Sequence, residues 1–192
     1  MLLYVCVISV CWLIFATGFS FTLSQPFWQI LLWIGAGIAL IVIVDGLTAA
    51  VVRLSPPLKD GKFFVVSKTE KTVYEKWKIR KWKDVIPEIG HFTGFRKNKL
   101  DDPKSVAYVD RFLLESRYGE IGHLLSCFTG CLILLAQFIP AFPARWWMLC
   151  IGVIVVNAVL NMLPYFVLRY NYYKLTVLRA SLVKKQAQQS CD

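Results

Sequence analysis

Four long apolar runs limit what this chain can fold into. The hydrocarbon core of a bilayer is about 30 Å thick, and a helix needs about 20 apolar residues to cross it. Four runs reach about this length, over residues 2–21, 27–52, 121–140 and 146–167. They lack the alternating ten-residue pattern of barrel strands, and backbone groups in lipid must bond within their own segment. We therefore predict an all-α integral membrane protein with four transmembrane helices.

The connections between these runs predict how the helices pair. Residues 22–26 and 141–145 are long enough only for tight turns, so the four helices form two hairpins. Hydrophobic residues make up 57% of the chain and charged ones 18%, which is more apolar than the surface of a globular protein tolerates. The first run has no basic region before it and no typical small-residue cleavage site, so we expect it to be retained.

Lysine and arginine predict the orientation. Residues 53–117 hold 16 of the 22 basic side chains, the tail holds five, and Arg145 alone lies in a short turn. Basic residues collect on the cytoplasmic side of membrane proteins. We therefore expect a multi-pass protein of the cell membrane with both termini cytoplasmic. Its segments are a first hairpin (1–52), a basic interfacial segment (53–118), a second hairpin (119–168) and a basic tail (169–192).

The interfacial segment contains an amphipathic stretch at residues 73–86. At 100° per residue a helix here has an aromatic arc opposite a cationic arc. The first consists of Tyr74, Trp77, Trp82 and Val85, and the second of Lys76, Arg80 and Lys83. Tryptophan prefers headgroup depth and lysine prefers anionic phosphates, so we predict one helix lying along the membrane surface.

The net charge of +10 points to anionic partners. Because the basic residues flank membrane runs and are mixed with tryptophan and tyrosine, we expect anionic lipid headgroups or a phosphorylated substrate rather than nucleic acid. The six cysteines include no C-x-x-C pair, so neither a metal site nor a disulfide is predicted. The oligomeric state is left open.

Titratable side chains gather where the third run begins. Glu120 and His123 have i,i+3 spacing and share a helix face. A carboxylate beside an imidazole holds its tautomer and raises its basicity, as a general base requires. Spacing alone equally fits a solvated pair, but ionisable groups at the end of a span favour a functional role. Glu115 lies on the same predicted helix, whereas His91 follows Pro87 and Gly90 in a loop.

Polar residues also occur inside the predicted spans. Asp45 lies within the second run, and Asn157 and Asn161 share one face of the fourth. A lone buried aspartate is costly unless it is neutral, hydrogen-bonded or facing a polar cavity. Interhelical hydrogen bonds and a substrate cavity therefore both remain open for these residues. Arg169, after Pro164, either reaches lipid phosphate or binds substrate.

Several of these residues occur in an order that resembles a known family, the glycosyl-4,4'-diaponeurosporenoate acyltransferases. The order is the run 77–83, His91, then Glu115, Glu120 and His123 as E-x-x-x-x-E-x-x-H, and finally Asn161 with Arg169-Tyr170-Asn171. The resemblance extends from about residue 74 to 175. It departs in the terminal motif, where Leu168, Tyr172 and Lys174 replace the family's residues.

The resemblance implies transfer of a fatty acyl group to a sugar hydroxyl of a membrane glycolipid or glycosylated carotenoid. His123 is then the base, oriented by Glu120, with Glu115 and His91 in the same motif. Asn161 or Arg169 would donate to the oxyanion. The expected substrate-binding set is Arg80, Lys81, Lys83, Trp77, Trp82, Asn161, Arg169, Asn171 and Asp45. No bound cofactor is expected, and acyl-CoA is the expected donor.

A second hypothesis comes from a different class. The chain would be a four-helix lipid-carrier flippase or accessory subunit that binds a glycolipid without making or breaking bonds. Asp45 and the asparagines would then form a polar track for a headgroup. The chain contains no G-x-S-x-G elbow, so a hydrolase-type covalent mechanism is not supported.

The orientation can be tested by cysteine labelling in intact cells. Single Lys71→Cys and Gln188→Cys variants should not react with a membrane-impermeant maleimide, because the reverse topology would translocate 16 basic residues. The parent chain gives the background from its own cysteines. Efficient labelling of either new cysteine from outside would contradict the predicted topology.

Overall fold

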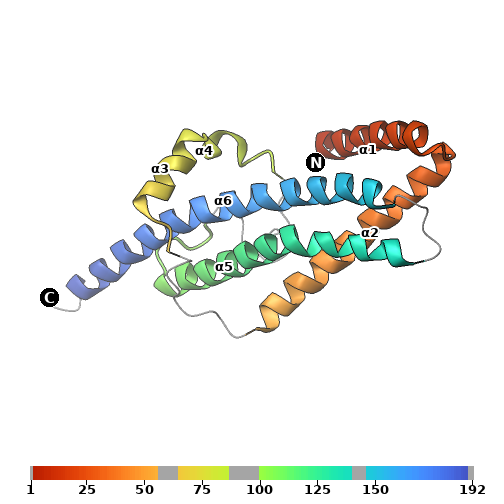
Figure 1. The fold of residues 1–192 in the computed structure, drawn as a ribbon. Coiled ribbons are helices and arrows are strands. Elements are labelled where there is room, and N and C mark those ends of the chain that lie inside the picture. Colours follow the sequence, from red (N-terminus) through yellow and green to blue (C-terminus); the bar gives the residue numbers. More distant parts are fainter. Residues whose placement is uncertain (1, 56–64, 87–99, 140–145, 190–192) are drawn as a thin grey trace. The chain divides into compact units, whose positions relative to one another are not determined.

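The computed structural model describes residues 2–55, 65–86, 100–139 and 146–189. Within these ranges the chain forms helices and no strand, which confirms the all-helical prediction (Figure 1). The elements in chain order are α1 (Leu2–Leu23), α2 (Phe27–Leu54), α3 (Lys68–Lys76), α4 (Ile79–Trp82), α5 (Val106–Thr129), the 3-10 helix η3 (Gly130–Phe138) and α6 (Trp146–Gln189).

Among the described residues, three helical stretches are long and apolar enough to cross a membrane. They are Phe27–Leu54, Val106–Leu135 and Trp147–Gln189, and in α1 a shorter apolar stretch covers Trp12–Leu23. Large apolar side chains lie exposed on these helices, among them Phe21 at 82% and Trp28 at 76%. Such exposure suits lipid rather than water. The fourth span and the two-hairpin topology stay predictions.

The prediction of one straight helix over residues 73–86 is wrong. Helix α3 ends at Lys76 and α4 begins at Ile79, because Lys78 adopts the left-handed conformation with φ 54° and ψ 36°. The bend buries the Ile79 side chain completely and lets Trp82 Nε1 donate a hydrogen bond to the Trp77 carbonyl at 3.0 Å. Burial of Ile79 thus overrides the simple periodicity of the segment.

The last two helices differ in length from the predicted spans. Helix α5 begins at Val106, ahead of the apolar run, and continues into the 3-10 helix η3. Helix α6 has 44 residues, about 66 Å at the helical rise of 1.5 Å per residue. It continues through Pro164 to Gln189, so nearly all of the predicted basic tail is helical.

The chain divides into two compact units, each with its own core. Unit 1 comprises Met1–Ala50 and Leu124–Met162, and unit 2 comprises Val51–His123 and Leu163–Asp192. The core of unit 1 consists of Ala16, Ile30, Ile34, Ile41, Ile133, Leu149 and Cys150. The core of unit 2 consists of Val66, Tyr74, Ile79, Val109, Phe112, Leu113, Val167, Tyr170, Tyr172 and Leu175.

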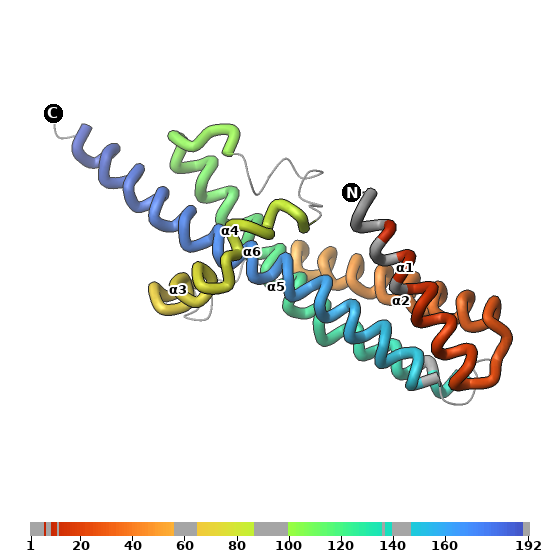
Figure 2. The backbone as a smooth tube through the Cα atoms, turned by 90° about the horizontal axis from the view of Figure 1, so that it is seen from above, coloured from red at the N-terminus to blue at the C-terminus, as the bar shows by residue number. Residues whose placement is uncertain are grey.

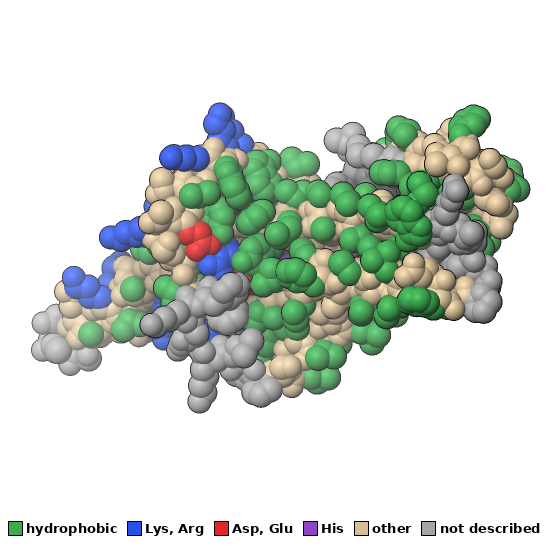
Figure 3. All heavy atoms as spheres, in the orientation of Figure 1, with side chains coloured by type: hydrophobic (Ala, Val, Ile, Leu, Met, Phe, Trp, Pro, Cys, Tyr) green, Lys and Arg blue, Asp and Glu red, His purple; other side chains and the backbone are tan. Residues whose placement is uncertain are grey.

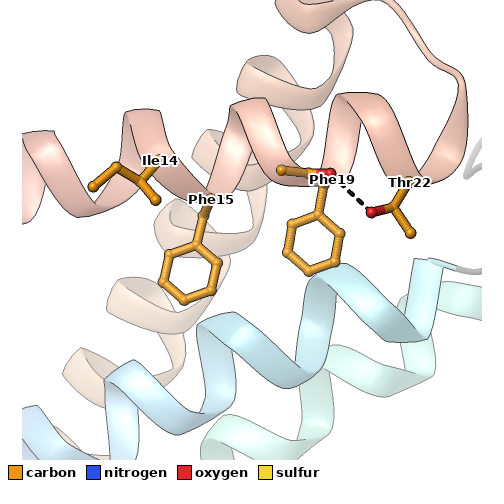
Figure 4. A pocket seen from close by; sticks show the side chains of 5 residues that line it. Ile14, Phe15, Phe19 and Thr22 are labelled. Carbon is orange, nitrogen blue, oxygen red and sulfur yellow. Dashed lines mark hydrogen bonds between the residues drawn. The ribbon is translucent and has the colours of Figure 1, made fainter.

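Unit 1 has a shallow apolar pocket of about 280 Å³ along α1 (Figure 4). Its lining residues are Ile14, Phe15, Gly18, Phe19 and Thr22. The Thr22 hydroxyl donates a hydrogen bond to the Gly18 carbonyl at 2.9 Å, and the other lining side chains are apolar. The phenyl rings point toward α6 in the close-up. With no titratable side chain among these residues, the pocket offers contacts for hydrocarbon but no groups for chemistry.

Gly130 tests the packing of unit 1. An added Cβ would lie 2.5 Å from Asn157 Nδ2, which donates to the Ser126 carbonyl at 2.9 Å. Gly130→Ala should therefore lower the free energy of unfolding by about 1–3 kcal/mol, because overpacking would displace this donor. Thermal unfolding in detergent measures the loss.

The matched control is Gly46→Ala in α2. An added Cβ there meets nothing within 4 Å, so the change should leave stability unchanged or raise it slightly through the higher helix propensity of alanine. Equal losses for the two variants would contradict the assigned packing.

Candidate functional site

The most extensive buried ionic cluster described in the chain centres on Arg169 of α6. Its Nε and Nη2 donate to the two carboxylate oxygens of Glu70 on α3, at 2.6 and 2.9 Å. Its Nη1 donates to Glu120 Oε1 on α5. Arg169 is 5% exposed and Glu120 1%. The planar guanidinium suits this double task, since its fork binds one carboxylate with two bonds while a third bond reaches another.

Helix α3 begins so that Glu70 faces this cluster. Ser67 is the N-cap, and its hydroxyl accepts from the Glu70 backbone N–H at 3.0 Å. The sequence Ser-x-x-Glu is that of a capping box, but here the glutamate side chain bonds Arg169 instead of turning back to the N-cap. One turn later, Tyr74 donates its hydroxyl proton to Glu70 Oε1.

These contacts shift the pKa of both groups on α3. Burial raises the pKa of Glu70, but hydrogen bonds from Arg169 and Tyr74 and the charge of Arg169 outweigh it, so the pKa lies below the usual value. Burial and the hydrogen bond to Glu70 raise the pKa of Tyr74. At neutral pH Glu70 is therefore ionised and Tyr74 remains a donor.

Close packing of α5 on α6 lets Glu120 reach Arg169. An added Cβ at Gly119 would lie 3.0 Å from Leu168 Cδ1, so glycine permits this approach. Beside it, Arg117 donates to the Tyr172 hydroxyl of α6. Helices α5 and α6 thus bring Arg117 and Tyr172 together next to Glu120 and Arg169, the two residues that the sequence had singled out.

Of the predicted catalytic residues, His123 and Glu120 lie one turn apart on α5. His123 is partly buried, and Glu120 is bound by Arg169. Glu115 forms ion pairs with Arg53 at 3.0 Å and Arg111 at 3.8 Å. His91 lies outside the described residues. The catalytic roles of all four stay predictions.

Helices α3, α4 and α6 of unit 2 form an open pocket of about 600 Å³. Its lining consists of Lys71, Glu75, Arg80, Tyr170, Tyr173, Lys174, Val177, Leu178 and Ser181. In Figures 1 and 2 α3 and α4 lie beside α6, and Figure 3 shows Lys and Arg side chains gathered over this region. The pocket therefore collects positive charge from three helices.

The pocket includes only part of the predicted substrate-binding set. Arg80 lines it, whereas Lys81 and Lys83 are not among the described lining residues. Lys71 and Lys174 were missed by the sequence reasoning. For Lys174 two signals were available, its place in the terminal motif and its spacing, since it follows Tyr170 by four residues and its ammonium lies 4.3 Å from the centre of that ring.

The predicted tryptophans have structural contacts next to this pocket. Trp77 packs edge-on against Phe166 of α6 with ring centres 5.1 Å apart, and Trp82 donates to the Trp77 carbonyl. Asn171 lies partly buried on α6. Together these contacts hold the bent segment between α3 and α4 on α6, while substrate contacts of the three residues stay predictions.

The polar residues in the apolar helices of unit 1 form a chain of hydrogen bonds. Asn161 Nδ2 donates to Asp45 Oδ2 at 3.2 Å and to Asn157 Oδ1 at 2.9 Å. Asn157 in turn donates to the Ser126 carbonyl at 2.9 Å. An interhelical hydrogen bond, one of the alternatives that the sequence left open, is thus present at Asp45 Oδ2, whereas Asp45 Oδ1 is buried without a hydrogen-bond partner in the described part of the chain. A substrate role for Asp45 or Asn161 stays a prediction.

Comparison with known protein families gives a match over most of the second half of the chain and the segment before it. The model of a family described as glycosyl-4,4'-diaponeurosporenoate acyltransferase matches residues 60–181. No curated protein and no solved structure matches. The matched residues include the Arg169 cluster, His123 and the whole pocket lining. Among the described residues, no group of three or more His, Cys, Asp or Glu could hold a metal ion.

The Arg169 cluster should be essential to stability. Arg169→Gln should lower the free energy of unfolding by about 3–5 kcal/mol, because it leaves the buried carboxylate of Glu120 and the partly buried one of Glu70 without their cation. Arg179→Gln on the same helix is the matched control, since its pair with Asp110 is exposed and should contribute only about 0–1 kcal/mol. Chemical denaturation in detergent measures both. Similar losses would mean that Arg169 does not hold the three helices together.

Proposed function

The chain belongs to the glycosyl-4,4'-diaponeurosporenoate acyltransferase family, and on this premise we propose that it transfers a fatty acyl group between a thioester and a sugar hydroxyl. The donor is acyl-CoA, presented from the cytoplasm. The acceptor is a membrane glycolipid or a glycosylated carotenoid. The observation that supports this function most is that the family match covers His123, the Arg169 cluster and the cationic pocket together.

The reaction needs one group that both accepts and returns a proton. His123 takes the proton of the sugar hydroxyl. At the same time the hydroxyl oxygen attacks the thioester carbonyl, and the new C–O bond forms. When the tetrahedral intermediate collapses, the C–S bond breaks and the departing thiolate takes the proton from the imidazolium. The products are the sugar ester and free CoA, and His123 is neutral again.

Arg169 and Glu120 serve as positioning residues in this scheme. Each of the three guanidinium nitrogens of Arg169 already donates to a carboxylate, so we assign it to holding helices rather than to the oxyanion. The ion pair between Arg169 and Glu120 holds the helical turn of α5 that runs from Glu120 to His123. A base fixed in this way meets an interfacial hydroxyl in one orientation, which lowers the entropic part of the barrier.

The direct test uses the purified protein in lipid nanodiscs. A glycosylated carotenoid acid and an isotopically labelled acyl-CoA are added, and the lipids are analysed by mass spectrometry. A mass gain of one acyl group in the carotenoid, with one free CoA released per ester, supports the proposal. Binding of the carotenoid without any acylation would overturn it and favour the carrier hypothesis.

His123 is the critical residue for turnover. His123→Ala should lower kcat by roughly 10²–10⁴-fold, the usual contribution of a general base, while the protein still folds and binds donor. Glu120→Gln keeps the shape of the side chain and should lose less. Each variant's thermal unfolding is recorded beside its kinetics. Near-normal turnover of His123→Ala, with turnover abolished in His91→Ala, would place the base in the loop instead.

A further inference from the structure

We propose that the pocket between α3, α4 and α6 binds the phosphate groups of the acyl donor, with Arg80 and Lys174 as the principal contacts and Lys71 beside them. The inference deepens the proposed function, because the ligand is the CoA thioester used there. It differs from the prediction made from sequence, in which the cations of the substrate-binding set on this segment were Arg80, Lys81 and Lys83 of one helix. Here the cations come from three helices.

The size of the pocket fits a ligand of this kind. Its volume of about 600 Å³ lies within the range of about 300–1,000 Å³ that is usual for small-molecule sites. One wall is cationic, and Val177 and Leu178 of α6 provide an apolar part. A CoA carrier has the same division, since its phosphates are anionic and its pantetheine arm is largely carbon. Phosphate binding at the cations would leave the arm to lie on the apolar wall.

Positive charges outnumber negative ones among the described lining residues of the pocket. Glu75 is the one carboxylate among the described lining residues, and it pairs with Lys71 at 3.4 Å. Within the described part of the chain, Arg80 and Lys174 form no ion pair. Lys174 is nevertheless held in place, because its ammonium lies over the Tyr170 ring. Two unpaired cations in an open pocket favour a ligand with more than one negative charge.

The bend at Lys78 is what directs Arg80 into this pocket. In a straight helix Arg80 would follow Lys76 by four residues and share its face, and Lys76 is exposed and not among the lining residues. A left-handed conformation in a residue other than glycine costs free energy and persists only where the surroundings enforce it. Here the buried Ile79 enforces it, and the result is that Arg80 lies with Lys71 of α3.

The test is a binding measurement that needs no turnover. Desulfo-CoA, which has the phosphates but cannot receive or give an acyl group, is titrated by calorimetry into the protein in nanodiscs of neutral lipid. Arg80→Gln and Lys174→Gln should each weaken binding about tenfold, as expected for the loss of one charge-assisted hydrogen bond. Lys76→Gln, an exposed lysine of the same segment outside the pocket, is the matched control and should remain within about twofold.

A second experiment distinguishes the phosphates of the acyl donor from the phosphates of membrane lipids. Anionic phospholipid headgroups also present phosphates, so vesicle binding is compared for neutral and anionic membranes. Loss of desulfo-CoA affinity in the pocket variants supports the proposal. If they bind desulfo-CoA normally and lose only binding to anionic vesicles, the pocket is a lipid site and the proposal fails. Because no acceptor is present, failure of the acyl-transfer assay leaves this result unaffected.

Discussion

One guanidinium determines how the helices of unit 2 pack. Arg169 binds Glu70 of α3 with two hydrogen bonds and Glu120 of α5 with another, so three helices meet at a single side chain of α6. In a poorly solvated interior such contacts give directional specificity that apolar packing alone does not, because an unpaired charge there is very unfavourable. The position of His123 and the cationic pocket beside α3 both depend on this arrangement.

The sequence predicted those parts of the fold that hydropathy and local spacing determine. The long apolar helices followed from run length, and a hydrogen bond between Asp45 and the asparagines of the fourth run was one of the two alternatives that the sequence left open. The pairing of Glu70 with Arg169 did not follow, since 99 residues separate them and no local pattern marks either as the other's partner. The sequence singled out Glu120 as the residue that orients His123, and this role stays a prediction; its contact with Arg169 depends on the tertiary packing of α5 against α6.

The error at residues 73–86 has the same origin. Periodicity describes a helix that continues, whereas burial of Ile79 against the core of unit 2 required the chain to turn. The bend then determined which cations gather in the pocket, with Arg80 included and Lys71 and Lys174 added from neighbouring helices. Periodic patterns identify candidate ligand-binding residues on one helix, but they do not show which cationic side chains of different helices come together.

The left-handed Lys78 also bears on how related sequences are read. Glycine and asparagine adopt this conformation readily, whereas β-branched residues strongly resist it. Substitution by valine or isoleucine would therefore favour a continuous helix and turn the residue at position 80 away. In a newly sequenced relative, the amino acid at the position of Lys78 therefore indicates whether this bend can form. The residue type at this position distinguishes relatives whose backbone tolerates the left-handed conformation from those whose backbone resists it.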